Sequence, residues 1–553
     1  MTIKKIKMTP WLVVRRTGVI LLLAVWVFSG CKKLDLAPSD RYTELTFWQV
    51  DDNVNNALDN IYNSIFISNP FFYNEALSDN AYTRLGISAG NVDAISSGSF
   101  TVDLNRFSSD WAYYYAGIKS CNIFLGNVDK NTTLPAATRD RMKAEARFVR
   151  AWHYVNLMKW WGDVPLLKED ITADQAKTMA RTPRAEVLQF ITDELDAAAT
   201  ALPTRDQYAA ADRGRVTKGA ALALKARVLL YEGDRMADVV TICEQLMNNQ
   251  AQNGTYSLFG NYEDLFKSSS KYNSEVIFDL AYVLNTRMWG DYIDFAPLSI
   301  GARSNNLAPT QELVDSYIMT NGKTIGDAGS GYDESNPYVN RDPRLTATVV
   351  YDQFVWKNAD GSTQKIFIKP GTSPAGQEQN EYKASGQGTA TGYYWRKYWD
   401  PVSVPTLQFG SNLILIRYAE VLLMYAEAKN SLGQMTSDVW DKTIGALRQR
   451  AGFTDAGALD FPGAGADLTA IIRNERRSEF AFEGLRVDDI RRWKIAETVM
   501  NGWAHGAKYG DPAVDNGYLR AQLRTFDKNK HYLWPVPSSE LVKDSKLTQN
   551  PNY

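Results

Sequence analysis

The sequence has little cysteine and no long apolar run after its first residues. Only Cys31, Cys121 and Cys243 occur among 553 residues, too few for a disulfide framework. Cys121 and Cys243 lie in apolar, helix-like surroundings, so we expect both to be buried and reduced. After Cys31 no apolar stretch reaches the roughly 20 residues that span a bilayer. We therefore expect the body of the chain to be soluble.

Signatures of catalysis and metal binding are also missing. His153, His505 and His531 are far apart, and none has the spacing of zinc ligands. The sequence has no Walker loop, no GxGxxG after a strand, no GxSxG elbow and no HExxH motif. We expect no catalytic residue, cofactor or metal ion, although a carboxylate pair assembled by folding would leave no local signature.

The N-terminal segment has the pattern of a secretory signal. Five basic residues and no acid precede the apolar run from Val19, which ends at Ser29-Gly30-Cys31. This ending resembles the lipobox of bacterial lipoproteins, in which cleavage before the cysteine is followed by its acylation. Because each buried CH₂ contributes about 0.8 kcal/mol, several acyl chains would hold the protein on a membrane. We predict a signal peptide over 1–30, lipidation (palmitate) of Cys31 and a tether over 31–46; the alternative is an ordinary cleaved signal.

The charge balance argues against one class of partner. Removing residues 1–30 leaves 56 basic and 63 acidic residues, a net charge of −7. A chain that binds nucleic acid usually carries a basic patch or excess. No nucleic-acid partner is expected.

Helical periodicity dominates both ends of the mature chain. A first helix is predicted from Asp51 to Phe66, a longer one over Ala136–Trp161, and another after Pro183. Leu224–Asp234 and Met424–Gln434 resemble each other, with a small residue mid-helix and a glycine turn before a second amphipathic helix. That pattern is typical of tetratricopeptide-type hairpins, although two alanine-rich helices can also agree by chance.

The middle of the chain, about 252–410, has a different character. It is rich in Gly, Ser, Asn and Tyr and has few helical runs beyond Gln311–Met319. Val349–Trp356 and Gln364–Lys369 flank an Asp-Gly turn and predict a β-hairpin. Long irregular insertions in a helical scaffold usually carry function, so we expect ligand contacts here.

Two features of the C-terminal part are expected to be structural. Ile471–Trp493 predicts one charged helix, in which Glu479 and Glu483 are expected to pair with arginines rather than act as an acid pair. The proline-rich stretch Tyr532–Glu540 predicts an extended strap instead of a helix.

Several of these segments together resemble the SusD/RagB family of surface lipoproteins. The segments occur in the family's order: PTQELVDSY (309–317), NRDPRL (340–345), LIRYAEVLLMYAEAKN (415–430), RNERRSEFAFEG (473–484), DDIRRWK (488–494), YLWPVPSSEL (532–541) and the closing NPNY. Leu485–Asp488 departs from the family pattern at a position that looks structural.

The resemblance implies a fold and a function. The implied fold is mainly α: a tetratricopeptide-like helical-hairpin scaffold, about 47–251 and 411–553, with long loop insertions, a small β-hairpin and a ligand-binding insertion at about 252–410. The implied function is capture of oligosaccharides, without catalysis, by an outer-membrane lipoprotein facing the cell exterior. It would act as a lid on a SusC-like TonB-dependent transporter for nutrient uptake.

The family places its ligand contacts after the first helix and in loops before PTQEL. By position, the corresponding residues here are Asp79, Asn80, Tyr82, Arg84, Trp289, Tyr292 and Arg303. Trp289, beside Gly290 in a polar segment, is the leading stacking residue, and Tyr394, Trp395 and Trp399 form an alternative platform. For each of these residues packing or ion pairing is the competing interpretation.

Other functions remain open at this point. A peptide-binding member of the same family would use similar loops. A lipoprotein glycoside hydrolase would need two carboxyl groups about 5.5 Å or 6.5–9.5 Å apart in an aromatic cleft. A purely structural transporter subunit would bind no ligand itself.

Overall fold

The computed structural model describes residues 44–84, 86, 90–404 and 407–553. The predicted signal peptide, Cys31 and most of the predicted tether lie outside these residues. Within the described part of the chain, every helix is too short or too polar to cross a membrane.

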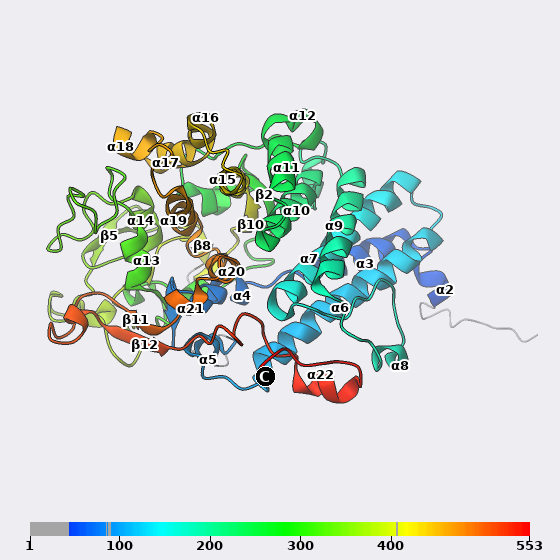
Figure 1. Ribbon diagram of the computed structural model, residues 1–553, viewed down its shortest axis with the longest axis horizontal. Helices are drawn as coiled ribbons and strands as arrows, with labels where there is room; N and C mark the ends of the chain where they lie inside the picture. The colour runs from blue at the N-terminus through cyan, green and yellow to red at the C-terminus, as the bar shows by residue number, and fades with distance from the viewer. Residues whose placement is uncertain (1–43, 85, 87–89, 405–406) are drawn as a thin grey trace, which may run out of the picture.

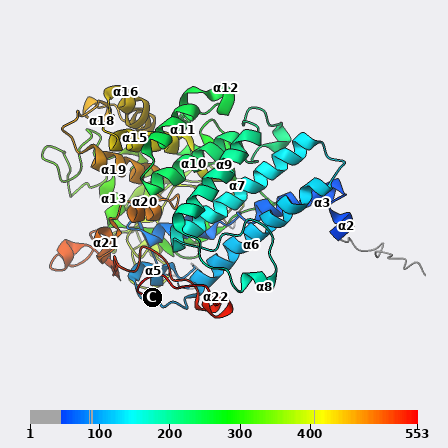
Figure 2. The same ribbon diagram turned by 45° about the vertical axis from the view of Figure 1, so that its right-hand side comes forward.

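Long antiparallel helices build one side of the molecule (Figures 1 and 2). Neighbours along the chain pack against each other, with α7 between α6 and α9, and α10 between α9 and α11. α7 has the predicted bounds, whereas α3 ends three residues before the predicted Phe66. The helices are α3 (Asp51–Asn63), α6 (Asn105–Asn127), α7 (Ala136–Trp161), α9 (Arg184–Ala201), α10 (Lys218–Glu232) and α11 (Met236–Asn248).

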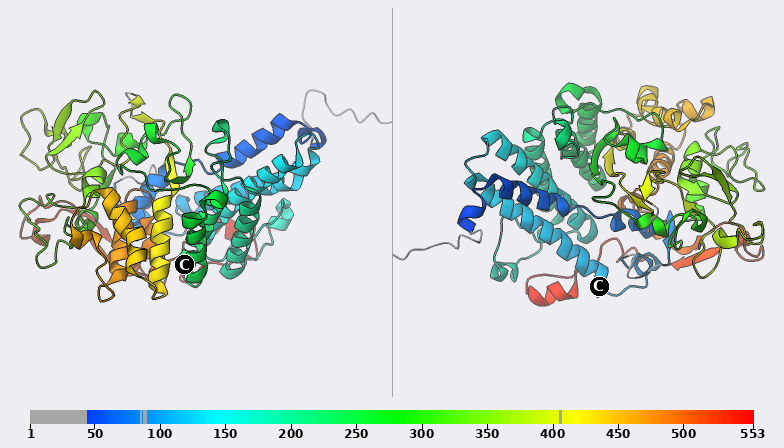
Figure 3. Two further views of the ribbon diagram at one scale, coloured as in Figure 1. Left: turned by 90° about the horizontal axis from the view of Figure 1, so that it is seen from above. Right: turned by 180° about the vertical axis from the view of Figure 1, so that it is seen from behind.

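The two predicted hairpins are present and lie next to each other. α10 turns into α11 through Gly233, and α15 (Tyr418–Ser431) turns through Gly433 toward α16 (Ser437–Trp440). Both glycines have positive φ, 85° and 68°, a conformation that glycine adopts without steric cost. After α16 the helix passes through a π turn, Asp441–Gly445, into α17 (Ala446–Ala451). α15 packs on α11, and Figure 3 (left) shows the yellow and orange helices beside the green ones.

The strands form two-stranded antiparallel pairs. The predicted hairpin turn is confirmed, but its strands are shorter than expected: β5 (Phe354–Lys357) pairs with β6 (Thr363–Ile366), while β4 (Val349–Val350) pairs instead with β7 (Tyr394–Trp395). The other pairs are β1 (Ala81–Thr83) with β3 (Leu307–Pro309), β2 (Val276–Leu280) with β10 (Leu413–Arg417), β8 (Ser403–Val404) with β9 (Gln408–Phe409), and β11 (Gly502–His505) with β12 (Arg520–Arg524).

Short helices connect these pieces. In the middle of the chain, α13 is shorter than predicted and ends at Ser316, because Tyr317 turns into the buried core with an extended backbone. The short helices are α2 (Glu44–Phe47), α4 (Asn69–Tyr73), α5 (Val92–Ser97), α8 (Ala173–Ala176), α12 (Gln250–Asn253), α13 (Gln311–Ser316), α14 (Pro343–Thr348), α18 (Ala456–Leu459) and α21 (Ala496–Val499).

The prediction of one continuous helix over 471–493 is wrong. α19 (Leu468–Phe480) ends before Ala481, and α20 (Arg486–Arg492) begins five residues later. Phe482 has a positive φ of 66°, and its buried ring stacks on Trp395, with centroids 4.1 Å apart and planes inclined by 10°. Packing against a ring distant in sequence therefore overrides the local helical pattern.

Glu479 and Glu483 have the structural role that the sequence suggests. Arg417 binds Glu479 at 2.5 Å, and Glu483 and Glu275 each at 2.8 Å, with all four side chains buried. Lys397 adds a 2.6 Å contact to Glu483. This buried ionic network joins α19 to β10 and to the residue before β2. Cys121 and Cys243 are buried free thiols, as predicted.

The C-terminal segment packs against the end of α7. Trp534 stacks on Trp160, with centroids 4.1 Å apart. The Trp161 indole donates to Pro535 O across 374 residues of sequence, and Asn550 Nδ2 donates to Trp161 O across 389. The predicted strap begins in a turn at Tyr532 and Leu533 and is free of helix from Trp534 to Pro537. Ser538–Lys543 then forms the helix α22, which contains no proline.

Candidate functional site

Strand pairing brings together the two segments that the sequence singles out. β1 and β3 pair antiparallel, with Tyr82 opposite Ala308 and Thr83 opposite Leu307. The residues after β1 therefore lie beside the loop before β3, and Arg84 N donates to Asn306 O at 3.3 Å. On β1 the side chains of Ala81 and Thr83 are buried while Tyr82 is partly exposed, as strand alternation requires.

Arg84 holds a third segment against this junction. Its Nη2 donates to Lys383 O at 2.9 Å and its Nη1 donates to Gly386 O. No ion pair to a carboxylate is found for it among the described residues. Partial burial lowers the pKa of Arg84, and the tyrosines Tyr82 and Tyr382 lie near enough to interact with it electrostatically. The guanidinium is thus fixed in place with its charge uncompensated.

Asp294 organises the neighbouring loop. Its carboxylate accepts two hydrogen bonds from Arg303, from Nε and Nη2, each at 2.8 Å. Ser304 and Asn306 donate to the same carboxylate at 3.1 and 3.0 Å. These bonds to Asp294 raise the pKa of Arg303, whose side chain is 65% exposed. We call the partly or fully exposed side chains of Tyr82, Arg84, Arg303, Asn306 and Tyr382 the loop surface.

Sequence reasoning missed Tyr382, Asn306 and Asp294. Tyr382 is the one aromatic residue in the glycine-rich stretch Gly371–Gly392, which is a usable signal. Asn306 and Asp294 had no comparable signal, because their roles depend on how the loop folds back on itself.

Trp289 and Tyr292 are core residues rather than part of the loop surface. Trp289 is 2% exposed, its indole donates to Ser411 O at 2.8 Å, and its ring stacks on Phe409. Tyr292 is fully buried and donates to Trp395 O at 3.0 Å. Neither ring has a face open to a sugar, so both belong to the core that supports the surface.

Asp79 and Asn80 are also buried. Asp79 forms ion pairs with Arg486 at 2.8 Å and Arg477 at 3.0 Å. Burial alone would raise the pKa of Asp79, but the two arginines outweigh it and hold the pKa well below its usual range. Asn80 donates to Glu75 and accepts from Arg477. Both side chains fix the segment before β1 to α19 and α20.

The alternative platform is buried as well. Tyr394 and Trp395 are fully buried, and Trp399 is 7% exposed. Trp395 is covered by Phe482 and Trp399 contacts Trp356. The aromatic run therefore packs the interior and presents no stacking surface.

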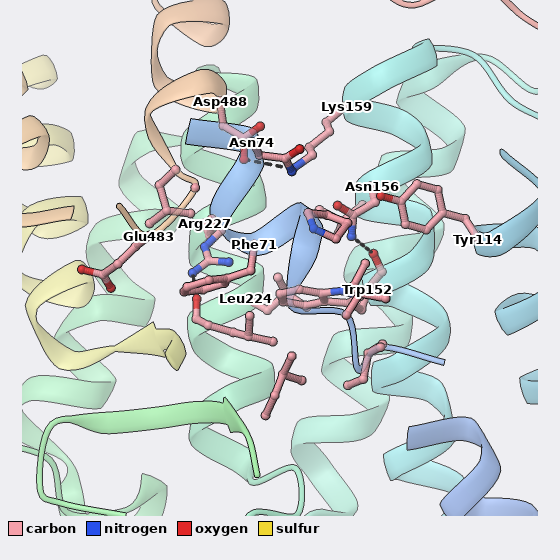
Figure 4. Close-up of a pocket in the computed structure, with 18 of the residues that line it drawn as sticks. Phe71, Asn74, Tyr114, Trp152, Asn156, Lys159, Leu224, Arg227, Glu483 and Asp488 are labelled. Atoms are coloured by element: carbon pink, nitrogen blue, oxygen red, sulfur yellow. Dashed lines mark hydrogen bonds and ion pairs between the residues drawn. The ribbon is translucent and has the colours of Figure 1, made fainter. Parts of the chain in front are cut away.

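A cavity of about 120 Å³ lies among the scaffold helices (Figure 4). Figure 4 shows Phe71 and Trp152 among the side chains that line it. Lys159 points toward Asp488, and its Nζ lies 3.0 Å from a carboxylate oxygen of Asp488. Arg227, also in the lining, pairs with Glu420. The cavity is smaller than the roughly 300–1,000 Å³ usual for ligand pockets, and these charged groups are already paired. It is a weaker ligand site than the loop surface.

Comparison with known proteins agrees with this architecture. Residues 274–553 match the family model described as the SusD family, and residues 34–230 match one described as starch-binding associating with outer membrane. A curated relative, SusD-like protein P25 of Formosa agariphila, is 26% identical over 91% of this chain and 92% of its own length.

Solved structures are similar over nearly the whole length. A SusD-like carbohydrate-binding protein of Bacteroides fragilis is 30% identical, with a TM-score of 0.81, over 91% of this chain and 100% of its own. A second SusD-like protein of that organism is 27% identical, with a TM-score of 0.76, over 92% and 98%. With a model of the family matching half of its residues and a 30% identical relative aligned along its length, this chain belongs to the SusD family.

Proposed function

We propose that this protein binds oligosaccharides without converting them and delivers them to a SusC-like TonB-dependent transporter. Family membership supports the proposal, as does the 30% identical relative named as a carbohydrate-binding protein. The observation that carries it is the half-buried Arg84 guanidinium, which is held by the carbonyls of Lys383 and Gly386 near Tyr82 and Tyr382 and has no carboxylate partner among the described residues.

The loop surface has the chemistry that sugars require. Sugar rings present apolar C–H faces, which pack on aromatic rings, and hydroxyl groups, which accept hydrogen bonds from guanidinium N–H groups. Arg84 is held by two backbone carbonyls and Arg303 by Asp294, so little side-chain freedom is lost on binding. Two guanidinium groups held in place in this way suit a ligand that carries several hydroxyl groups.

Binding is favoured over glycoside hydrolysis by the state of the local carboxylate. A hydrolase needs two carboxyl groups free to act on the glycosidic bond. At the loop surface Asp294 already accepts hydrogen bonds from Arg303, Ser304 and Asn306. A peptide ligand is the remaining alternative within the family.

The location of the protein is part of the proposal. We propose that Cys31 carries the lipid anchor, that residues 31–46 form the tether, and that the protein acts at the outer face of the outer membrane. Support comes from the signal-like N-terminal sequence and from the match of residues 34–230 to a family described as associating with the outer membrane.

Calorimetry on the full-length protein tests ligand binding. Starch- and cellulose-derived oligosaccharides and a mixture of tryptic peptides serve as probes. If an oligosaccharide binds, Arg84→Ala should weaken it about tenfold, equivalent to about 1.4 kcal/mol. Arg235→Ala is the matched control, because Arg235 lies on the scaffold, pairs with Asp238 and has a side chain that is 40% exposed.

Two results would contradict the proposal. Binding of peptides but of no oligosaccharide would favour the peptide alternative, and equal affinity in the Arg84 and Arg235 variants would show that ligand binds elsewhere.

A further inference from the structure

A second pocket opens on the scaffold side of β2. It has a volume of about 340 Å³ and lies between the loop that leads into α10, residues 205–217, and the segment 272–279. That size falls within the roughly 300–1,000 Å³ usual for small-ligand pockets. None of its lining residues belongs to the loop surface.

Asp279 is the buried acid of this pocket. It is 4% exposed and accepts one hydrogen bond, from Asn412 Nδ2 at 2.8 Å, and no ion pair to it is found in the described part of the chain. Burial raises its pKa to about 6, because it outweighs the lowering by the hydrogen bond from Asn412 and by the charges of Lys271 and Arg205. Burying a carboxyl without a cationic partner costs stability, which is a common property of binding sites.

Tyr272 lines the same pocket in an unusual backbone conformation. Its φ is 56°, a left-handed value that costs a tyrosine about 1–3 kcal/mol. Arg205 stabilises the turn by donating to Tyr272 O at 2.9 Å, Asn273 O at 3.1 Å and Val276 O at 3.1 Å. The strained turn fixes a partly exposed tyrosine at the pocket wall.

Arg213 supplies an exposed donor on the opposite segment. It lines the pocket, its side chain is exposed, and no ion pair to it is found among the described residues. An acceptor, a ring and a guanidinium thus line one space. Asp206 and Arg215 also line it, and among the described residues neither Asp206 nor Asp279 forms an ion pair with Arg213. With three arginines against two acids in its lining, the pocket suits a neutral ligand with several hydroxyl groups better than a cation.

We propose that this pocket is a second sugar-binding subsite, in which Asp279 accepts hydrogen bonds from ring hydroxyls, Tyr272 packs on the ring and Arg213 donates to it. The pocket has the size for a single sugar ring or the end of a chain. The sugar class of the ligand rests on the proposed function, but the subsite does not depend on the loop surface.

Titration of the full-length protein with D-glucose, D-galactose, D-mannose and N-acetyl-D-glucosamine, followed by saturation-transfer NMR, tests the subsite. Asp279→Asn should weaken binding of a responding sugar at least fivefold and at the same time raise Tm, because the buried unpaired carboxyl is removed. Arg213→Ala should weaken binding severalfold with Tm unchanged, since its side chain is exposed. Arg235→Ala should change neither quantity.

The outcomes separate this inference from the proposed function. If no monosaccharide binds, or if Asp279→Asn raises Tm while affinity is unchanged, the subsite is overturned. If Arg84→Ala abolishes monosaccharide binding and the pocket variants do not, the subsite fails and the loop surface stands. If the pocket variants weaken binding and Arg84→Ala affects no sugar, the subsite stands and the loop-surface proposal fails.

Discussion

Asp79 and Arg84 lie on one short segment, but their side chains have opposite surroundings. Asp79 is buried between two arginines, whereas Arg84 is half-buried and faces two backbone carbonyls. Both were predicted from position as ligand contacts. Residue type and spacing do not distinguish them, because the difference arises from α19 and α20, which contribute Arg477 and Arg486 about 400 residues later in the chain.

Trp289 provides a residue-scale prediction. Because its ring is enclosed by Phe72, Phe409 and Tyr398, Trp289→Ala should lower the free energy of unfolding by about 3–5 kcal/mol. Urea denaturation monitored by circular dichroism measures this change. Calorimetry should find the oligosaccharide affinity of the folded variant unchanged.

The control for Trp289 is an exposed tryptophan. Trp503 is 38% exposed, so Trp503→Ala should change stability by only about 0.5 kcal/mol. A loss of affinity in folded Trp289→Ala, without loss of stability, would return Trp289 to the binding site.

At the scale of elements, the regular helices follow from sequence and the breaks do not. Ala136–Trp161 repeats its apolar face over many turns, and its predicted bounds agree with α7. The break after α19 depends on Phe482 reaching Trp395, and the short β4 depends on β7. Contacts between distant segments decide these features, so a local pattern cannot reveal them. The loop surface likewise depends on contacts between distant segments, since β1 pairs with β3 and Arg84 binds the carbonyls of Lys383 and Gly386.

The hairpin of β11 and β12 gives a prediction about pH. His505 Nδ1 lies 2.7 Å from Glu312 Oε1 on α13, and this hydrogen bond raises the pKa of His505. Because the pKa of His505 is higher in the folded than in the unfolded state, the protonated histidine stabilises the hairpin. This stabilisation is fully present below a pH of about 6.5, the ordinary histidine pKa, and is lost as the pH rises through the folded-state pKa. Amide hydrogen-exchange protection in 502–505 and 520–524 should therefore fall between mildly acidic and mildly basic pH.

His505→Gln is the matched variant for the hairpin. Glutamine can still donate to Glu312 but does not titrate, so protection should become independent of pH. A pH response of equal size in this variant would assign the effect to another group.

At the scale of the whole molecule, the buried ionic network links the middle of the chain to the C-terminal helices. Burial alone would raise the pKa of Glu479, but Arg450, Arg417 and Arg344 outweigh it and lower the pKa well below its ordinary value. Glu479→Gln removes one carboxylate partner from each of these three buried cations and should cost about 3–5 kcal/mol of unfolding free energy. Chemical denaturation at neutral pH measures the loss.

The depressed pKa also sets the response to acid. The stabilisation from Glu479 is present above the ordinary glutamate pKa and is lost as pH falls through the lower folded value. The control is Glu334, which pairs with Lys508 and has a side chain that is 62% exposed. Glu334→Gln should lower the free energy of unfolding by less than about 1 kcal/mol. Equal losses in the two variants would refute a special role for the buried network.

The anchor is tested on the intact cell. Cys31→Ser should release the protein from the membrane fraction and abolish the mass added by acyl chains, measured by fractionation and mass spectrometry. Cys121→Ser should keep both properties, since Cys121 is a buried thiol of the body. Membrane association of Cys31→Ser would exclude the proposed anchor.

The contacts of Trp534, Pro535 and Asn550 with the end of α7 have a consequence for how the protein is made. α7 cannot complete its packing until residues several hundred positions later have emerged, and contacts so distant in sequence slow folding. For a chain that we propose is exported, delayed folding is useful, because an unfinished core leaves the polypeptide able to thread through a narrow translocation channel. Because these residues are translocated last, the protein would complete its folding only after it has crossed the membrane.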